Sequence, residues 1–425
     1  MIAEVRCQGI AGSIRALPSP QHSATALMLS SMTGESSTLR RPSLDDDFIV
    51  LLRVLRSMGL AAELRSGDLY VQSEDMGMTA DRMDVGSSET AFCMVSALAS
   101  NIPRRCTVDG SLSSAFPMHP YVNALLNLGV TCEFPRQDWK LPLNIRGPHR
   151  SHMTYLPGDS PSIMFLSLAL SSLYGVRATR IEAVGTVNKP LLHPCDSHLM
   201  TEFGVHMDQT ARSVNNPGGQ RCRPADVMVP GDDDLNEFLV CLALMHGSLK
   251  VLDVHHASPG IRCLEMAGLD IGRQYQALEA KASRPEGPRL DAGTASRSLP
   301  LLMVAASSWK DTTRISFSKE GMTLDEKSSL REAMDILRKM GCHVVEEPGI
   351  LMVPGTDLEP VSIRVKNPFS GLMAILAASR CPGTRIVGIE RVEGRYPGLL
   401  SGLRALDVEI IPADDDEQVF LLQVD

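Results

Sequence analysis

Residues 23–59 of the chain read SATALMLSSMTGESSTLRRPSLDDDFIVLLRVLRSMG. The segment opens with an apolar stretch, SATALMLSSMTG, whose length and composition are typical of a buried helix. A short β-rich run follows, and then DDDFIVLLRVLRS, in which apolar residues recur at the spacing of an amphipathic helix. Glycine is the usual residue just beyond a helix, and Gly59 stands there. The segment therefore predicts a buried helix, a strand and an amphipathic helix in that order.

The same unit recurs six times along the chain. The buried helices are predicted at 23–34, 89–100, 162–175, 236–247, 298–309 and 369–379, and the amphipathic helices end at Gly59, Gly129, Gly204, Gly268, Gly341 and Asp407. These ends lie about 70 residues apart, which is longer than the repeats of about 20–50 residues found in the common solenoids. A complete βαβαββ unit, used six times, fits this period.

The six units divide into three and three. The most loop-like stretch, Ser213–Pro224, lies between the third and the fourth unit, and a second cluster of helix breakers, Leu17–Pro20, precedes the first. The N-terminal strand, predicted over Ile2–Ile14, is thereby separated from the first unit. We expect a mixed α/β (α+β) protein with one domain at 1–17 plus 225–425 and another at 18–224.

Composition and charge exclude several classes of function. A net charge of −9 gives no general affinity for nucleic acid, and no long apolar stretch predicts a membrane span. The ten cysteines are scattered singly, which is typical of reduced thiols in the cytoplasm and predicts no metal site. We expect a cytoplasmic monomer that carries no cofactor and contacts neither nucleic acid nor membrane.

Several short segments resemble one enzyme family in their order along the chain. Residues 17–59 resemble an opening LPGSKS followed by RALLLAALA, and the later segments are GSSETAFC (86–93), SPSIMFLS (160–167), NKPL (188–191), VPGDDD (229–234) and EGRYPG (393–398). They stand where the enolpyruvyl transferases, and most closely the EPSP synthases (3-phosphoshikimate 1-carboxyvinyltransferases), have GNAGTAMR, SVSSQFLS, SKPY, VPGDAS and AKSFPG. The resemblance covers essentially the whole chain, and it implies the two-domain inside-out α/β barrel of that family.

The resemblance also implies a function. The substrates that it implies are phosphoenolpyruvate and shikimate-3-phosphate of the shikimate pathway, which leads to aromatic amino acids. In that family they are bound between the two domains. Two anions in a dry cleft repel each other, so such a site needs lysines and arginines around it. It also needs a carboxylate base and a cationic acid to move protons.

Most of the charged positions that the resemblance implies carry other residues here. The Lys and Ser of GSKS fall at Pro20 and Gln21, the Arg of RALLL at Thr25, and the Arg of GNAGTAMR at Cys93. In the second half, the catalytic Asp of the PDxA segment falls at Arg297, and the segments KESDR and DHRMAM correspond to 325–329 and 368–373, which read DEKSS and PFSGLM. We therefore expect an active site that is strongly diverged, with ordinary EPSP synthase activity largely lost.

A small set of polar residues remains near these positions. Glu326 and Arg395 are the candidate catalytic residues, and the candidate substrate-binding residues are Gln21, His22, Ser162, Lys189, Arg297, Lys327 and Arg395. His22 is singled out because it would lie at a helix N-terminus, where anions bind favourably.

Three readings stay open from the sequence. The chain is a diverged paralogue without the ordinary reaction, or an enolpyruvyl-type transferase that acts on another anionic small molecule. In the third reading it is a non-catalytic protein that binds a ligand or a partner protein, through apolar residues that replace or adjoin polar family positions: Phe92, Phe116, Met164, Leu191 and Phe369.

Overall fold

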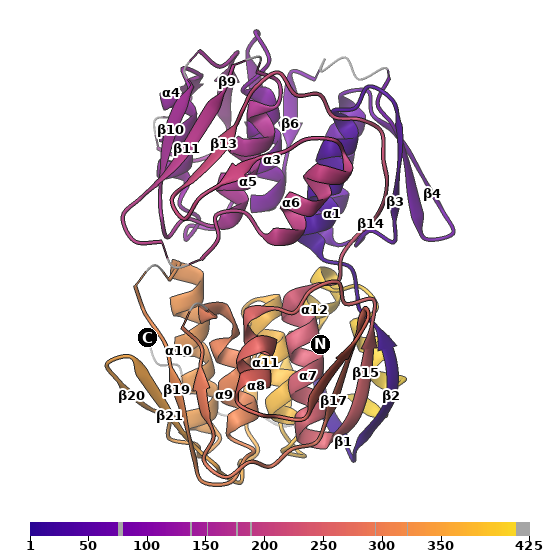
Figure 1. Ribbon diagram of the computed structural model, residues 1–425, viewed down its shortest axis with the longest axis vertical. Coiled ribbons are helices and arrows are strands. Elements are labelled where there is room, and N and C mark those ends of the chain that lie inside the picture. The colour runs from indigo at the N-terminus through magenta and orange to yellow at the C-terminus, as the bar shows by residue number, and fades with distance from the viewer. Residues whose placement is uncertain are drawn as a thin grey trace. The chain divides into compact units, whose positions relative to one another are not determined.

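The computed structural model describes residues 1–74, 80–136, 138–150, 152–175, 177–187, 189–293, 295–320 and 322–413 (Figure 1). Asn188, the first residue of the NKPL segment, lies outside these ranges. The chain forms two compact units. Unit 1 comprises Met1–Leu17, Asp233–Phe317 and Glu326–Asp425, and unit 2 comprises Pro18–Asp232 and Ser318–Asp325.

The described part of unit 2 forms three sheets of four strands. In order within each sheet they are β14 (Asp226–Met228), β3 (Ser36–Arg40), β5 (Asp68–Gln72), β4 (Ala61–Arg65); β6 (Arg82–Asp84), β7 (Cys106–Asp109), β9 (Leu143–Arg146), β8 (Thr131–Glu133); and β10 (Met153–Pro157), β11 (Thr179–Val184), β13 (Ser213–Asn216), β12 (Asp208–Gln209). The sheets share one plan: the first two strands are parallel and the other two neighbouring pairs are antiparallel.

Unit 1 repeats this plan three times. Its sheets are β2 (Ile10–Arg15), β15 (Gly247–Leu252), β17 (Ala277–Lys281), β16 (Ile271–Gln274); β18 (Arg289–Asp291), β19 (Thr312–Ser316), β21 (Ile350–Pro354), β20 (Val345–Glu347); and β22 (Ser362–Arg364), β23 (Arg385–Val387), β1 (Ile2–Cys7), β24 (Val408–Pro412). The same parallel and antiparallel pairings recur in each of them. The six predicted repeats are thus six copies of one sheet topology.

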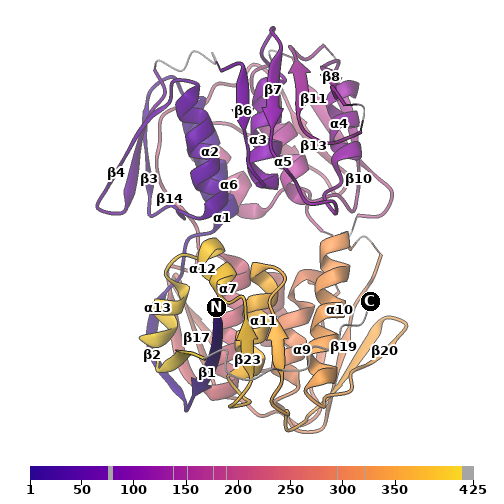
Figure 2. The ribbon, with the colours of Figure 1, turned by 180° about the vertical axis from the view of Figure 1, so that it is seen from behind.

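Two details differ from the sequence-based expectations. The single N-terminal strand predicted over Ile2–Ile14 is two strands, β1 and β2, which belong to different sheets of unit 1 (β1 lies beside β23 in Figure 2). The second boundary between the units lies at Asp232/Asp233 rather than at 224/225. The reason is that β14 pairs in parallel with β3, with Asp226 opposite Thr38, and so completes the first sheet of unit 2.

The apolar segments form helices in the middle of each unit. These are α1 (Pro20–Ser31), α3 (Glu89–Ala99) and α5 (Ser162–Ser172) in unit 2, and α7 (Asp233–His246), α9 (Leu299–Ala306) and α11 (Pro368–Ala378) in unit 1. Every residue of α9 is buried, and so is every residue of α11 but one. Nearly all residues of the other four helices are buried as well. A helix that is apolar on every side is stable only where neighbours cover it all round. The strands lie around these helices, which is the inside-out arrangement (Figure 1).

The amphipathic segments form the second helix of each repeat. They are α2 (Asp46–Ser57), α4 (Met118–Asn127), α6 (Pro194–Glu202), α8 (Pro259–Met266), α10 (Leu324–Lys339) and α13 (Leu399–Arg404). The described residues also form a short helix, α12 (Glu390–Arg395), and a 3-10 turn (Ser296–Ser298). Each second helix is followed by a residue in the left-handed conformation, for example Gly268 with φ of 79° and Asp407 with φ of 60°. The predicted helix ends are confirmed.

No helix among the described residues combines the length and the apolar character that crossing a bilayer requires.

Candidate functional site

Two of the predicted binding residues lie in the first turn of α1, in unit 2. Pro20 begins this helix, and Gln21 and His22 follow it. The packing of α1 against α6 brings the first turn of α1 close to that of α6. His193 precedes α6 as its N-cap, with its side chain accepting a hydrogen bond from the backbone N–H of Cys195. Residues from two distant repeats therefore meet at one place.

The centre of this place is the carboxyl group of Asp196, which has no exposed surface. Gln21 Nε2 donates a hydrogen bond of 2.9 Å to Oδ2, and Thr25 Oγ1 donates one of 2.9 Å to Oδ1. His22 Nε2 lies 3.8 Å from Oδ1. Burying a carboxyl group without hydrogen-bond partners costs free energy, and these side chains supply such partners. Sequence reasoning did not single out Asp196, although it stands in the first turn of a predicted helix.

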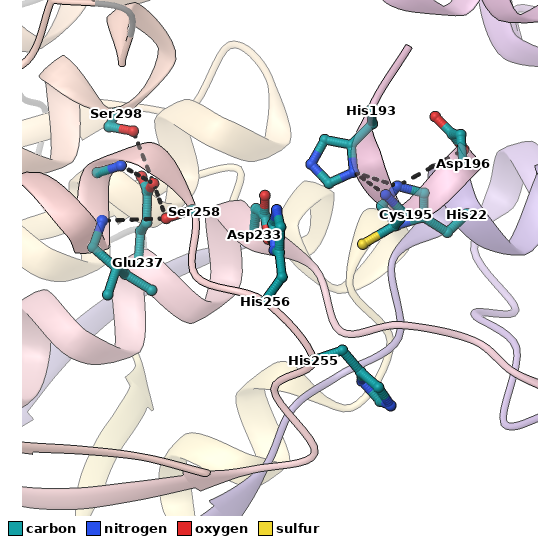
Figure 3. A network of polar contacts seen from close by, with 12 residues as sticks. His22, His193, Cys195, Asp196, Asp233, Glu237, His255, His256, Ser258 and Ser298 are labelled. Atoms are coloured by element: carbon teal, nitrogen blue, oxygen red, sulfur yellow. Dashed lines mark hydrogen bonds and ion pairs between the residues drawn. The ribbon is translucent and has the colours of Figure 1, made fainter. Parts of the chain in front are cut away.

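His22, His193 and Cys195 form a second cluster at the same place (Figure 3). His22 Nε2 and His193 Nδ1 are 3.1 Å apart, and the centres of the two rings are 4.8 Å apart. One possible ligand atom from each of the three residues lies within 4.8 Å of the other two. His22 and Cys195 are buried, while His193 is half-buried. This combination of imidazole and thiol groups can bind a transition metal.

Three further residues of unit 2 belong to the positions discussed from the sequence. Ser162 is the first residue of α5 and Lys189 lies in the loop between β11 and α6, and both are half-buried. Glu89 begins α3, in the GSSETAFC segment, and burial together with nearby carboxylates raises the pKa of its carboxyl to about 7. Sequence reasoning missed Glu89; the signal was an acidic residue where the resembling family segment has glycine.

Arg297 lies in unit 1 and is held by an ion pair. Its Nε and Nη2 donate to the two oxygens of Asp234 in α7, at 2.8 and 2.5 Å. The guanidinium carbon also lies 5.4 Å from the centre of the Phe369 ring. The arginine side chain is 59% exposed and the aspartate side chain 12%. The cation at this candidate position is therefore already paired with a carboxylate of its own unit.

A buried carboxyl group that the sequence analysis did not identify lies in the same unit (Figure 3). Glu237 in α7 is 4% exposed. Its Oε1 accepts hydrogen bonds from Ser298 Oγ at 2.8 Å, from the Gly260 N–H at 3.1 Å and from Ser258 Oγ. Burial raises the pKa of Glu237 to about 8, the charge of Asp234 adds to this, and the bonds from Ser258 and Ser298 oppose it. Because Gly260 and Ser258 open α8, this carboxyl joins α7 to the start of α8.

The remaining candidates lie on two other helices. Glu326 and Lys327 are in the first turn of α10, where Glu326 is 7% exposed and Lys327 is half-buried. Arg395 is the last residue of α12 and is half-buried. Gln21 and His22 are thus brought together at one site of unit 2, whereas Arg297 contacts a different set of residues in unit 1.

The apolar residues considered as a partner-binding surface are all buried. Exposure is 0% for Phe92 and Met164, 2% for Leu191, 8% for Phe116 and 9% for Phe369. The first four pack within the core of unit 2. These residues fill the interior and do not form an exposed apolar face.

Comparison with known proteins gives a consistent result. The family model described as EPSP synthase (3-phosphoshikimate 1-carboxyvinyltransferase) matches residues 6–403. The chain is 27% identical to a 3-phosphoshikimate 1-carboxyvinyltransferase of Halobacterium salinarum, over 96% of this chain and 99% of that protein. It is 24% identical to one of Methanothrix thermoacetophila, again over 96% and 99%.

Solved structures share the fold. EPSP synthase from Acinetobacter baumannii superimposes with a TM-score of 0.82 at 16% identity, covering 97% of this chain and 100% of that one. The enolpyruvyl transferase NikO from Streptomyces tendae superimposes with a TM-score of 0.75 at 15% identity, covering 96% and 98%. The chain has six copies of one sheet topology around buried helices, and the family model matches nearly its full length. This chain therefore belongs to the EPSP synthase family.

Proposed function

We propose that this chain is a diverged paralogue within the EPSP synthase family that does not carry out the ordinary reaction of phosphoenolpyruvate with shikimate-3-phosphate. The observation that carries the proposal is the buried carboxyl of Asp196, held by Gln21 and Thr25. By the resemblance of residues 17–59, Gln21 and Thr25 stand where the family has a serine and an arginine that meet anionic substrate. A carboxyl group at this place supplies none of the positive charge that such a substrate needs.

Two more features of unit 2 point the same way. Cys93 stands where the GNAGTAMR segment ends in arginine, and it is fully buried in α3. Glu89 places a carboxyl at the start of the same helix, where backbone N–H groups and the helix dipole otherwise favour an anion. This carboxyl competes with any phosphate for that end of α3.

Unit 1 supports the proposal through Arg297 and Ser370. Arg297 stands at the position of the catalytic aspartate, and a guanidinium stays protonated near neutral pH, so it cannot act as a base. Its charge is already matched by Asp234. Ser370 stands within the segment that resembles DHRMAM, and its side chain accepts from the backbone of Asn367 as part of the capping box of α11. Neither residue supplies the missing acid or base.

The size of the loss decides between weakened and absent activity. A hydrogen bond to a charged group contributes about 1.5–3 kcal/mol, and a positioned acid or base contributes about 10²–10⁴-fold in rate. Several such groups are replaced together. Because effects of residues that act as a unit do not simply add, no single reversion is expected to restore turnover.

Binding and turnover of the purified full-length chain test the proposal. We expect calorimetry to show no micromolar binding of shikimate-3-phosphate or phosphoenolpyruvate and no ternary complex with glyphosate. We also expect no phosphate release when both substrates are supplied, and no growth of a strain that lacks EPSP synthase when this gene is expressed. The enzyme from Halobacterium salinarum serves as positive control in each assay.

Turnover or complementation would overturn the proposal, above all if it were abolished by Glu326→Gln or Arg395→Gln. Release of phosphate from phosphoenolpyruvate with a different acceptor, and not with shikimate-3-phosphate, would support the divergence and identify the chain as a transferase for another anionic small molecule. The half-buried cations Lys189, Lys327 and Arg395 are the groups that would then be substituted first.

A further inference from the structure

We propose that His22, His193 and Cys195 form a binding site for a Zn²⁺ ion in unit 2. The three side chains come from the first turn of α1 and the start of α6, and one ligand atom from each lies within 4.8 Å of the others (Figure 3). This site does not rest on the proposed loss of the ordinary reaction.

The donor set suits zinc. Zn²⁺ is bound by imidazole nitrogen at about 2.0–2.1 Å and by thiolate sulfur at about 2.3 Å, in tetrahedral geometry. Such bond lengths place neighbouring ligand atoms about 3.3–3.6 Å apart. His22 Nε2 and His193 Nδ1 are already 3.1 Å apart, so the two imidazoles need almost no movement. Since the ligand atoms lie within 4.8 Å of one another, the thiol sulfur has to move closer by no more than about 1.5 Å, which rotation of a side chain provides.

The surroundings of the cluster favour a cation. The buried carboxyl of Asp196 has one oxygen 3.8 Å from His22 Nε2. This oxygen lies beside the nitrogen that would hold the ion, and a carboxyl oxygen there attracts positive charge. His22 and Cys195 are 4% and 7% exposed, so competition from water is limited on that side. His193 is half-buried. A tetrahedral ion with three protein ligands leaves its fourth position to a water or to an oxygen of a ligand.

Metal binding has a definable cost. In the metal-free chain His193 Nδ1 accepts from the Cys195 N–H as the cap of α6. This nitrogen therefore has a lone pair, and His22 Nε2 donates the hydrogen bond between the two rings. A metal ion needs the lone pairs of both nitrogens and a deprotonated thiol. Binding therefore releases protons, and it weakens as the pH falls. The bare hydrogen-bonded pair of histidines is the alternative that the experiment has to exclude.

Chain position alone could not reveal this site. The cysteines are scattered singly, which predicted no metal, and His22 is 171 residues from His193. Only the packing of α1 on α6 brings them together.

Co²⁺ is the spectroscopic probe for the full-length chain, because a thiolate ligand gives a sulfur-to-cobalt charge-transfer band that imidazole alone does not. We expect one Co²⁺ per chain with this band, and displacement of Co²⁺ by Zn²⁺. Cys195→Ser should abolish the band and weaken Zn²⁺ binding by about 100-fold or more, since one of three protein ligands is lost. Cys222→Ser, at a cysteine of the same unit that is also buried, is the matched control and should change neither.

A second variant distinguishes loss of a metal ligand from misfolding of the chain. His193→Asn removes the imidazole but keeps a side chain that can cap α6. It should retain the circular dichroism of the parent chain and lose the band. Absence of stoichiometric Co²⁺ and Zn²⁺ binding by the parent chain overturns the proposal, as does a band that survives Cys195→Ser. Binding of Cu⁺ without Zn²⁺ overturns the assignment to zinc.

Discussion

The hydroxyl of Thr25 donates a hydrogen bond of 2.9 Å to Oδ1 of Asp196, a residue 171 positions later in the chain. Thr25 and Asp196 both have no exposed surface. The bond joins the first repeat to the third within unit 2 and holds a carboxyl where the family resemblance implies an arginine. This bond therefore connects the stability of unit 2 with the replacement of an arginine by Thr25 that the resemblance implies.

Thr25→Val should destabilise unit 2. The substitution keeps the shape of the side chain but removes a donor to a buried carboxyl, which costs about 1–3 kcal/mol of unfolding free energy. Urea unfolding followed by circular dichroism measures the loss, with the affected transition compared between variants because two units can unfold in separate steps. Thr201→Val is the control, since its hydroxyl bonds to Ser197 at an exposed helix surface. Equal effects at both positions would contradict the role given to Asp196.

The stability of unit 1 should depend on pH through Glu237. Burial raises the pKa of this carboxyl from 4.5 to about 8. Below about pH 4.5 the group is protonated in the folded and the unfolded chain alike, so its contribution to the free energy of unfolding is fully present. As the pH rises from there to about 8, the unfolded chain loses the proton while the folded chain retains it, and stability falls. Above about pH 8 both states are ionised and no further change is expected.

Glu237→Gln removes this dependence, because an amide keeps an acceptor oxygen for Ser258 and Ser298 and does not titrate in this range. Relative to that variant, the parent chain should lose about 2–4 kcal/mol between pH 5 and pH 8. Unfolding curves at a series of pH values check the difference. Glu279→Gln, at an exposed carboxyl paired with Lys281, should leave the pH profile of the parent unchanged. Parallel profiles for parent and Glu237→Gln would show that the buried group does not titrate as described.

Gly268→Ala should destabilise unit 1 through the backbone alone. Gly268 has φ of 79° just beyond α8, and a methyl group added there meets no atom within 4 Å. The cost is therefore the left-handed conformation itself, about 1–2 kcal/mol for a residue with a side chain. Gly272→Ala in β16 is a matched control, because its methyl group also meets nothing and its φ is not positive. Thermal unfolding should show a lower midpoint for the first variant and an unchanged or higher one for the second.

Arg297 and Asp234 should be coupled energetically. A double-mutant cycle with Arg297→Gln and Asp234→Asn should give a coupling free energy of about 1 kcal/mol that decreases in high salt, because the arginine is more than half exposed. The pair Arg40–Asp226, in which both side chains are 51% exposed, should show a smaller coupling. No measurable coupling in the Arg297–Asp234 cycle would mean that Asp234 does not neutralise Arg297 in solution.

The site was only partly predictable. Gln21 and His22 were identified because a helix start is visible in the sequence, and their neighbourhood at the N-terminus of α1 follows from that. Asp196, Cys195 and Glu237 were missed because nothing local distinguishes a buried acid or thiol from an exposed one. The apolar residues from Phe92 to Phe369 were interpreted as a possible surface, whereas packing places them in the interior.

The six repeats, the two kinds of helix, the helix-ending residues and the family follow from the sequence alone. The reason is that periodicity, helix ends and motif order are properties of neighbouring residues. Three features are visible only in the folded chain: β1 and β2 enter different sheets, β14 completes a sheet of unit 2, and His22 lies beside His193 and Cys195. Those outcomes depend on how helices and strands far apart in the chain pack against each other, and burial and hydrogen-bond partners are fixed only when that packing forms.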